Sequence, residues 1–425
     1  MKSEIAEMLL LQLERSQPVI RGRDSRYRGE TRIRFTRDEV AKDLNRFGVN
    51  LCRLAVTSVA ERIRVKRLVA SVKGRDVSVR ANQLWALSDM DQNLEGAIID
   101  ALAVGAAYLI VWKRPDGLPS VWVESAEQVT VKCDPVTRET VAAVKRWYSY
   151  DELGVQTDEY VMLYEQSEIT LFKRSTAGRL EVVWSDSNPL GVVPVVPLIN
   201  RDRPGDSVGY SIIDDLADLV DALNKTLADM LTTSEAVARP KRWVAGVDLE
   251  EDVVSEGFTA DGPTQIVPAA GTQPAKSPFA DGNQMWVTES PEAKFGQLPG
   301  ADLNGYRSAV DLLVQQIMAV SSLPAHMIGV TTANPTSADS IRAAEAGLTA
   351  KAESRQRVLG TAIEYAIRLL LAIDHDVQVS DVGVQIKWAN AATRSIAQEA
   401  DAVLKLVQVG VMTIEEARDL IDMGL

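Results

Sequence analysis

The clearest pattern in the chain is an alternation of apolar and charged stripes between Ser211 and Trp243. Apolar residues recur there at steps of three and four, which places them on one face of an α-helix. Ser211 followed by Asp214 is typical of a capping box, and Pro240 cannot continue a helix. The pattern therefore predicts a helix of about 27 residues, roughly 40 Å long. Its apolar stripe holds Ile212, Leu216, Leu219, Val220, Leu223, Leu227, Met230 and Leu231, and its opposite stripe holds Asp214, Asp218, Asp221, Lys225 and Asp229.

The composition changes after this helix. Residues 243–300 are rich in Gly and Pro, with short β-like pieces such as TQIVPA and QMWVTE between them, so we expect a small β-rich module. A second helix follows at once, because its apolar residues step by three and four as in a heptad seam. We expect the two helices to pack along each other, with the module inserted between them. The seam consists of Leu303, Tyr306, Val310, Leu313, Ile317 and Val320.

The remainder of the C-terminal part is predicted to be mostly helical. Pro324, Gly329 and Pro335 break the helix pattern within residues 321–340, and one helix of about 36 residues follows from Ala338 to Ile373. Two helices are expected in residues 391–425. In that tail Thr393 is expected to cap the first helix, Gly410 to end it, and Thr413 with Glu416 to form a capping box for the second.

The N-terminal half mixes helical and strand patterns. The alternation in 140–185 predicts an antiparallel meander, and two prolines make 191–200 extended. We expect helices at 2–15, 43–61 and 85–104, strands at 62–69, 105–112 and 121–135, and a polar, Arg-rich arm or loop at 16–37.

Length and charge limit the possible classes of protein. A chain of 425 residues exceeds one core, so at least two modules are expected. No apolar run is long enough for a membrane span, and the amphipathic N-terminus is unlike a signal peptide. Cys52 and Cys133 cannot build a disulfide framework, which favours a reducing compartment.

The net charge is −13, although residues 1–80 carry 19 Lys and Arg against 10 Asp and Glu. This balance argues against a tight duplex-DNA binder but allows loose contact with DNA.

The sequence contains no recognisable catalytic or metal-binding motif. It has no phosphate-binding GxxxxGK[ST] loop, no HExxH, no paired CxxC and no GxSxG. The two histidines, His326 and His375, are far apart and are interpreted as structural or surface residues. The tail resembles a helix-turn-helix, but its second helix, TIEEARDLID, is acidic and would repel phosphates. We therefore expect neither an enzyme nor a cofactor or metal.

Several stretches in order resemble the portal proteins of tailed bacteriophages, of the siphovirus type, which form the ring at one capsid vertex. Each motif is short, but together they span most of residues 25–375. The similar stretches are Tyr27–Gly29, Asn50–Val56, Trp85–Asn93, Gly105–Val111, Gly191–Pro194 with Asn200–Arg201, Gly209–Ser211 with Leu219–Asn224, Ala238–Trp243, and Asn334–Ser337 with Ala343–Glu345.

The resemblance implies an α+β, multidomain portal fold with a wing, a two-helix stem, a small β-rich clip, a long wing helix and a short helical crown. Carried over to this chain, it implies wing at 1–210, stem helix 1 at 211–242, clip at 243–300, stem helix 2 at 301–322, tunnel loop at 323–339, wing again at 340–390 with the long helix and a return strand, and crown at 391–425, here short and possibly truncated.

The same resemblance implies roles for particular residues. The tunnel loop would present Thr331, Thr332, Asn334 and Thr336 to DNA, and it contains no Lys or Arg between Leu323 and Ser340. Asp214, Asp218, Asp221 and Lys225 would line the channel or face an arginine of a neighbouring subunit, and the sequence leaves both open. Arg342 is a phosphate contact or the intrahelical partner of Glu345, and the pairing is favoured. In the clip, Gly262, Pro263, Gly282 and Trp286 would shape the surface on which partners dock.

The implied function is a channel for packaging and ejecting double-stranded DNA. The implied partners are other copies of the chain in a ring of twelve, double-stranded DNA, the terminase large subunit, head-completion or adaptor proteins, and the major capsid and scaffolding proteins, with no membrane. The implied location is one vertex of the virion, and the host cytoplasm during assembly. The alternatives are another ring-forming tail or baseplate protein that never holds DNA, and a hydrolase that uses scattered carboxylates.

Overall fold

The structure is a computed structural model of the chain. It describes residues 2–30, 48–175, 177–203, 209–238, 242–245, 292, 294–297, 302–329, 338–392, 396–411, 413–414 and 417. The chain divides into two compact units, one of residues 1–227 with 309–425 and the other of residues 228–308. The expectation of more than one module is therefore confirmed.

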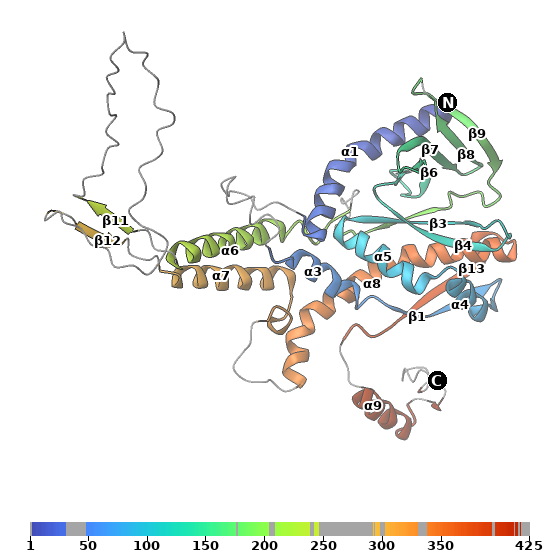
Figure 1. Cartoon of the computed structure of the whole chain (residues 1–425). Coiled ribbons are helices and arrows are strands. Elements are labelled where there is room, and N and C mark those ends of the chain that lie inside the picture. The colour runs from blue at the N-terminus through green and yellow to red at the C-terminus, as the bar shows by residue number, and fades with distance from the viewer. Residues whose placement is uncertain are drawn as a thin grey trace, which may run out of the picture. The chain divides into compact units, whose positions relative to one another are not determined.

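The larger unit mixes helices with three antiparallel sheets (Figure 1). Its helices are α1 (Lys2–Arg28), α3 (Leu51–Ala60), α4 (Ser78–Leu87), α5 (Met90–Ala103), α8 (Ala338–His375) and α9 (Ile396–Gln408), with short 3₁₀ turns η1 (Ala325–Met327) and η2 (Val379–Asp381). Its strands are β1 (Val65–Val72), β2 (Arg75–Asp76), β3 (Ala106–Lys113), β4 (Pro119–Ser125), β5 (Val129–Cys133), β6 (Thr140–Tyr150), β7 (Gln156–Glu165), β8 (Glu168–Arg174), β9 (Leu180–Ser187), β10 (Val195–Ile199) and β13 (Val382–Trp388).

The strand orders are β13-β1-β2, β10-β3-β4 and β5-β6-β7-β8-β9. The last of these is the antiparallel meander that the sequence predicts, and every connection in it is a hairpin. In the first sheet, β1 pairs with a strand more than 300 residues later, with Leu68 opposite Ile386. The two halves of the larger unit therefore share one sheet, although the smaller unit interrupts them in sequence.

Two helices, α6 (Ala217–Ala238) and α7 (Asn304–Ser321), contribute residues to both units. In the smaller unit, β11 (Arg242–Ala245) pairs with β12 (Lys294–Gln297) in an antiparallel ladder. In the same unit the hydroxyls of Thr233 and Tyr306 lie 3.1 Å apart and join the two helices. Helix, strand pair and helix thus follow in the order that the sequence predicts.

Among the described residues, three hydrophobic clusters hold the larger unit together. The largest lies among α3, α4, α5 and α8 and the first two sheets, with fully buried residues such as Leu102 and Leu370. The second fills the space between the β10-β3-β4 sheet and the meander. The third lies where α1 covers the other face of the meander with Leu9, Leu10 and Leu13. Alternate residues of β6, β7 and β8 face these two clusters, as the period of two in a strand requires.

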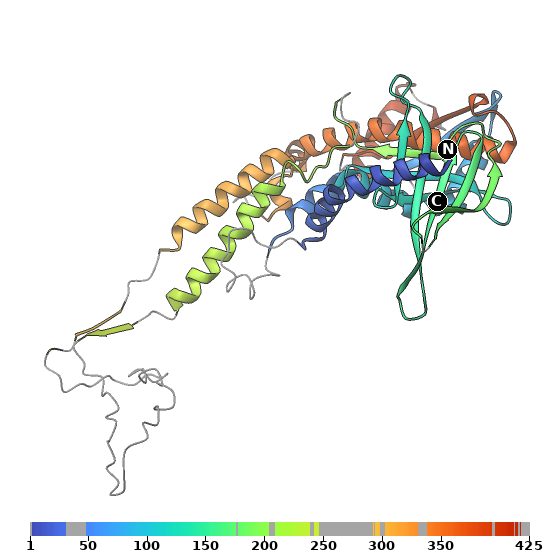
Figure 2. The same ribbon diagram turned by 90° about the horizontal axis from the view of Figure 1, so that it is seen from above.

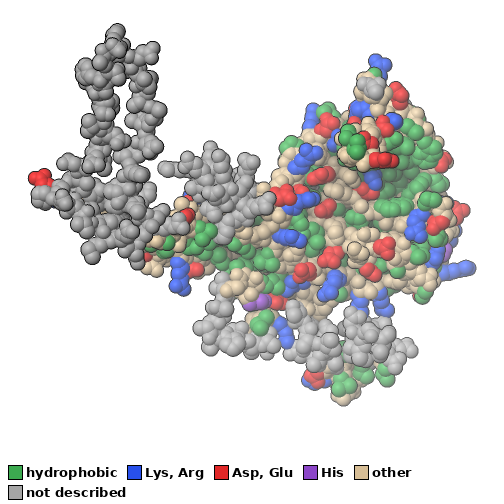
Figure 3. Space-filling view, viewed as in Figure 1, with side chains coloured by type: hydrophobic (Ala, Val, Ile, Leu, Met, Phe, Trp, Pro, Cys, Tyr) green, Lys and Arg blue, Asp and Glu red, His purple; other side chains and the backbone are tan. Residues whose placement is uncertain are grey.

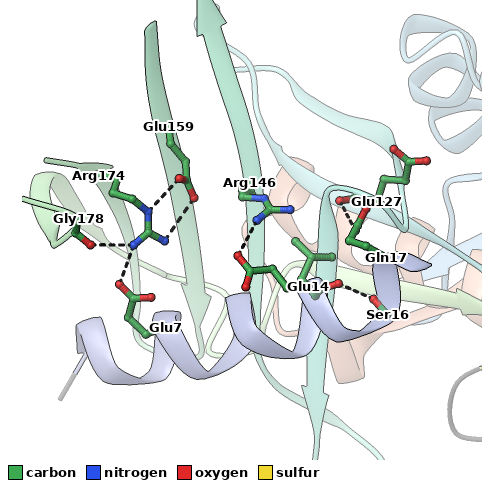
Figure 4. A network of polar contacts seen from close by, with 10 residues as sticks. Glu7, Glu14, Ser16, Gln17, Glu127, Arg146, Glu159, Arg174 and Gly178 are labelled. Carbon is green, nitrogen blue, oxygen red and sulfur yellow. Dashed lines mark hydrogen bonds and ion pairs between the residues drawn. The ribbon is translucent and has the colours of Figure 1, made fainter. Parts of the chain in front are cut away.

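The prediction of a short helix at 2–15 followed by an arm at 16–37 is wrong for residues 16–28, because α1 continues to Arg28. Polar contacts hold α1 along the meander (Figure 4): Arg174 bonds both Glu7 and Glu159, and Arg146 bonds Glu14. Pro18 removes one helix hydrogen bond, and α1 bends along its length in Figure 1. Tertiary contacts therefore override a sequence that looks like a loop.

Three other boundaries also need correction. The single helix expected at 85–104 is two helices, α4 and α5, because Asp89 adopts a left-handed backbone conformation between them. The helix expected at 43–61 is described only from Leu51, where Asn50 accepts a hydrogen bond from the amide of Arg53 as a cap. The helix expected from Ser211 begins at Ala217 and has 22 residues, after a series of turns.

Other elements agree with the prediction. The long helix α8 has 38 residues, and α7 lies within the expected 301–322. Gly410, with φ +74°, follows the end of α9 as expected. Thr393, Glu416 and most of the second tail helix lie outside the described residues, as do the β pieces expected within 251–290. The fold is mixed α and β, and the division into wing, stem, clip and crown stays a prediction.

Candidate functional site: the roots of helices α6 and α7

Two arginines near the end of α1 bind two carboxylates, one just before α6 and one in its first turns. Arg23 donates two hydrogen bonds to the carboxylate of Asp214, of 3.1 Å from Nε and 2.5 Å from Nη2. Its Nη1 donates to the carbonyl of Val104. One turn further on, Arg26 Nη2 lies 3.2 Å from Asp221, and both side chains are only 15% exposed. Charge-assisted bonds with little access to water are stronger than surface ion pairs. The start of α6 is therefore fastened to α1.

The capping box expected at Ser211 does not form, because both of its side chains have other partners. Ser211 is fully buried, its hydroxyl donates to the carbonyl of Ala103, and its oxygen accepts from the amide of Ile213. Asp214, the other half of the expected box, is held by Arg23. Ser211 thus fixes the segment before α6 to the end of α5, and Asp214 fixes it to α1, instead of starting a helix.

Two glycines allow this segment to approach the end of α5 closely. Gly105 and Gly209 have φ of +105° and +83°. A Cβ atom on Gly209 would lie 2.1 Å from the carbonyl oxygen of Gly105, a distance that real contacts do not reach. Asn200 completes the junction, because its amide donates to Gly105, its carbonyl accepts from the amide of Tyr210, and its side chain donates to the carbonyl of Tyr210.

A polar cluster surrounds a cavity of about 240 Å³ beneath the ends of α6 and α7 that belong to the larger unit. Arg355 of α8 donates to Asn200 and Asp202 and lies over the Tyr210 ring, 5.9 Å from its centre. The Tyr210 hydroxyl donates to Asp215. Burial, followed by this neighbouring carboxylate, raises the pKa of Tyr210, so its phenol stays protonated as a donor.

The end of α7 is fixed to α8 in a similar way. Lys351 donates from Nζ to the carbonyl of Val320 at 2.8 Å, near the negative end of the α7 dipole. Burial lowers the pKa of Lys351. Further along, Glu345 of α8 is 5% exposed and lies 3.2 Å from His326 Nε2 and 3.5 Å from Arg62. The segment that leads out of α7 is thereby held between α8 and the end of α3.

The predicted site residues divide into those the structure describes and those it does not. Asp214 and Asp221 bind arginines of their own chain, whereas the exposed Asp218 makes no ion pair within the described residues. Lys225 and Arg342 are half-buried and take part in interactions. Thr331, Thr332, Asn334 and Thr336, together with Gly262, Pro263, Gly282 and Trp286, lie outside the described residues, so their predicted roles stay predictions.

The sequence analysis missed the residues that hold the two helices in place. The sequence predicts a polar arm or loop at Arg23 and Arg26, and Arg355 and Lys351 are only polar positions of a long helix. Glu345 is predicted, but as the partner of Arg342 and not of His326 or Arg62. No local signal relates these residues, because Asp214 precedes α6 and Asp221 lies within it, so the two carboxylates do not share a helix face that the spacing could reveal.

No catalytic chemistry is evident in the arrangement. Within the described part of the chain, no three His, Cys, Asp or Glu side chains converge in a way that would hold a metal ion. A search of the same residues found no helix with the length and apolar character needed to cross a membrane. The geometry fixes helices in place through ion pairs and close backbone contacts.

A family model described as phage portal protein, SPP1 Gp6-like, matches residues 12–422. The chain therefore belongs to this family of phage portal proteins. It is 29% identical over 385 residues to the portal protein of Mycobacterium phage D29, covering 88% of this chain and 75% of that protein. It is 28% identical over 384 residues to the portal protein of Mycobacterium phage L5, with the same coverage.

Solved structures with a similar course of the chain come from gene transfer agent particles. One is the neck of an empty particle computed with C6 symmetry, at 15% identity and a TM-score of 0.47, with 90% of each chain covered. Another is the neck of a native particle computed with C12 symmetry, at 14% identity and a TM-score of 0.43, covering 91% of this chain and 90% of that one.

The family match confirms the portal prediction over the alternative of a tail or baseplate protein. Portal proteins are structural components of the virion, which agrees with the expectation that the chain is not an enzyme.

Proposed function

We propose that the chain assembles into a ring of twelve copies at one capsid vertex, and that double-stranded DNA passes through its centre during packaging and ejection. The observation that carries this proposal is the family match across residues 12–422, almost the whole chain. Assembly would take place in the host cytoplasm. The ring would also be the platform for the terminase large subunit, the head-completion or adaptor proteins, and the capsid and scaffolding proteins.

The residues divide naturally among the parts of such a ring. We assign residues 1–210 and 340–390 to the wing, 211–242 and 301–322 to the stem, 243–300 to the clip, 323–339 to the tunnel loop and 391–425 to the crown. The separate compact unit at 228–308, which contains the β11–β12 pair, supports a distinct clip on which partners dock. The polar clusters at the start of α6 and the end of α7 support a stem that is anchored in the wing.

The charge suits a channel that lets DNA slide. Twelve copies at −13 each would carry about −156, so the ring as a whole repels phosphates instead of holding them by counterion release. Of the stem carboxylates, Asp214 and Asp221 are neutralised by arginines of the same chain. Asp218 lies on α6 and its side chain is exposed. We therefore assign this carboxylate to the channel wall.

Electron microscopy and native mass spectrometry of the full chain test the ring. The expected particle is a closed ring of twelve chains whose bore admits a B-form duplex. A species that stays monomeric under every assembly condition, or a ring with a bore too narrow for duplex DNA, would contradict the proposed function.

A charge reversal tests the channel wall within that ring. Asp218→Lys would place twelve cations in the channel, so we expect at least a tenfold gain in affinity for duplex DNA and a steeper salt dependence. Glu95→Lys is the matched control, because Glu95 is an exposed carboxylate on α5 of the same unit. Equal gains from both variants would show that Asp218 does not face the channel.

A further inference from the structure

The strand β9 ends the five-stranded meander, and its outer edge is unpaired in the described part of the chain. Its inner edge pairs with β8 over the whole of Leu180–Ser187. Apart from a bond between the amide of Ser187 and the carboxylate of Asp186, no other hydrogen bond within the described residues reaches the backbone of β9. Figure 1 labels β9 at the outer margin of the meander, and Figure 2 shows the same green strands at the right of the larger unit. An open edge of this length can accept another strand.

β9 also exposes apolar side chains on both faces of the sheet. Val182 lies opposite Phe172 on the face that α1 covers, yet it is 60% exposed. Trp184 lies opposite Leu171 on the other face and is 43% exposed. Val183 lies between them, where the pairing with β8 shifts by one residue, and is 55% exposed. Figure 3 shows hydrophobic side chains gathered at the upper right of the larger unit, where Figure 1 places β8 and β9. A strand added beside β9 would cover side chains on both faces.

The other end strands of the three sheets in the larger unit are less open, which argues against a described strand of a second copy as the partner. β10 has Pro197 at its centre, which lacks an amide, and β2 has only two residues. On the other three, a side chain of the same chain takes up a backbone group, and these contacts are Gln12 with the carbonyl of Val131 on β5, Ser88 with the amide of Val121 on β4, and Glu364 with the amide of Ile386 on β13.

Charge opposes the pairing of β9 with another β9 and favours a basic partner. Glu181 and Asp186 lie on the same face as Trp184, one on either side of it. Neither carboxylate forms an ion pair within the described residues, and Lys173, which lies opposite Glu181, binds Asp158 instead. The eight residues of β9 include no Lys or Arg. Two copies of β9 side by side would bring carboxylates together, whereas a strand with a cation near each end would neutralise them.

We propose that β9 accepts an extended segment of a different protein as a sixth strand of the meander. The segment that fits has Lys or Arg on either side of an apolar centre, so that its cations meet Glu181 and Asp186 while the centre covers Trp184. One chain carries the whole edge, so this inference does not depend on the ring. It goes beyond the proposed function by stating the chemistry of a partner and the strand that binds it.

A synthetic peptide tests the pairing on the full chain. The probe is a peptide of alternating Val and Thr, about nine residues long as is usual for a strand, with a Lys near each end. By isothermal titration calorimetry we expect it to bind roughly tenfold more tightly than the same peptide with Glu in place of Lys. A version in which every amide is N-methylated keeps the side chains but cannot donate to the backbone of β9, so we expect it not to bind.

Hydrogen exchange, followed by mass spectrometry, shows where the peptide binds. Amides on an unpaired edge exchange with water, and pairing with an added strand protects them. We expect the Lys peptide to slow exchange within Leu180–Ser187 by roughly tenfold, and to leave exchange in the hairpin between β6 and β7 unchanged.

A charge swap tests the match of side chains. Glu181→Lys combined with Asp186→Lys should reverse the preference, so that the Glu peptide binds roughly tenfold more tightly than the Lys peptide. Both side chains are exposed, so we expect the fold to be kept. The matched control is Glu139→Lys with Glu152→Lys, which changes two exposed carboxylates in turns of the same meander. It makes the same change in net charge and should leave the preference for the Lys peptide as it is.

The outcomes bear on this proposal separately from the ring. Equal binding of the Lys and Glu peptides, binding that survives N-methylation, or protection away from β9 would each overturn it. Protection of β9 that increases with the concentration of the chain alone would show that a second copy occupies the edge, which also overturns it. Failure of the chain to form a ring would contradict the proposed function alone, because these measurements use the edge of a single chain.

Discussion

Gly209→Ala adds a single methyl group at the glycine that leaves the least room for one among the described glycines. The new Cβ would lie 2.1 Å from the carbonyl oxygen of Gly105 and 2.7 Å from its carbonyl carbon. Both neighbours are backbone atoms, so no side chain can rotate away. The two segments would have to separate by about 1 Å, and they are joined by hydrogen bonds from Asn200 N to Gly105 O at 3.0 Å and from Tyr210 N to Asn200 O at 2.8 Å.

The expected loss of stability has two parts. The left-handed φ of +83° costs an L-residue about 1 kcal/mol. Lengthening or breaking one buried hydrogen bond adds roughly 1–3 kcal/mol, so the total is about 2–4 kcal/mol, a large share of the 5–15 kcal/mol typical of a domain. Urea unfolding of the monomeric chain, followed by tryptophan fluorescence, measures it as a lower midpoint.

Gly117→Ala provides the matched control. Gly117 has φ of +85°, but a Cβ there would meet nothing within 4 Å, so this variant reports the backbone term alone, about 1 kcal/mol. The difference between the two variants isolates the close approach of the two backbone segments. If Gly209→Ala costs no more than Gly117→Ala, the close contact does not hold α5 to the start of α6, and our account of that junction is wrong.

Two other predictions concern ionisable groups. A double-mutant cycle of Arg26→Met with Asp221→Asn should give a coupling energy of about 1–3 kcal/mol, because both side chains are only 15% exposed. The exposed pair Lys405–Asp401 is the control and should give less than about 0.5 kcal/mol. Similar coupling energies for the two pairs would refute the anchoring role of Arg26 and Asp221. Burial, with nearby Asp24, raises the pKa of Asp100 to about 6. The native state therefore holds the carboxyl proton of Asp100 more tightly than the unfolded chain does, and the stability of the fold decreases as the pH rises through 6. Asp100→Asn should therefore raise the melting temperature at pH 8 and change it little at pH 4, and an equal change at both pH values would contradict this assignment.

The elements with a strong period could be predicted from the sequence. The meander, α7 and the 38-residue α8 follow from alternation or from steps of three and four, and the Gly and Pro content marked the inserted module. The start of α6 could not be predicted, because the local sequence around Ser211 and Asp214 fits a capping box that the fold does not form. Their real partners, Ala103 and Arg23, lie more than 100 residues away in sequence.

The ion pairs of the candidate site could not be predicted, because neither the sequence nor the resemblance assigns arginines of the same chain to Asp214 and Asp221. Nothing in the period of α1 shows that Arg23 and Arg26 meet α6, since an Arg-rich segment is equally typical of a solvated loop. A hydrophobic cavity of about 260 Å³ between the β10-β3-β4 sheet and the meander was missed for a related reason. Trp112, Trp122 and Trp184 come from strands of two sheets, and alternation within one strand does not reveal which strands of different sheets face each other.

The pairing of β1 with β13 has a consequence for synthesis. Val65 faces Trp388 across the ladder, so at elongation rates of roughly 5–20 residues per second the ribosome needs about 16–60 s after making β1 to deliver its neighbour. During that time one edge of β1 lacks its partner and the nascent chain is open to misassociation. The first sheet of the larger unit therefore cannot be completed until Val382–Trp388 have been made, even though β1 is among the first strands to leave the ribosome.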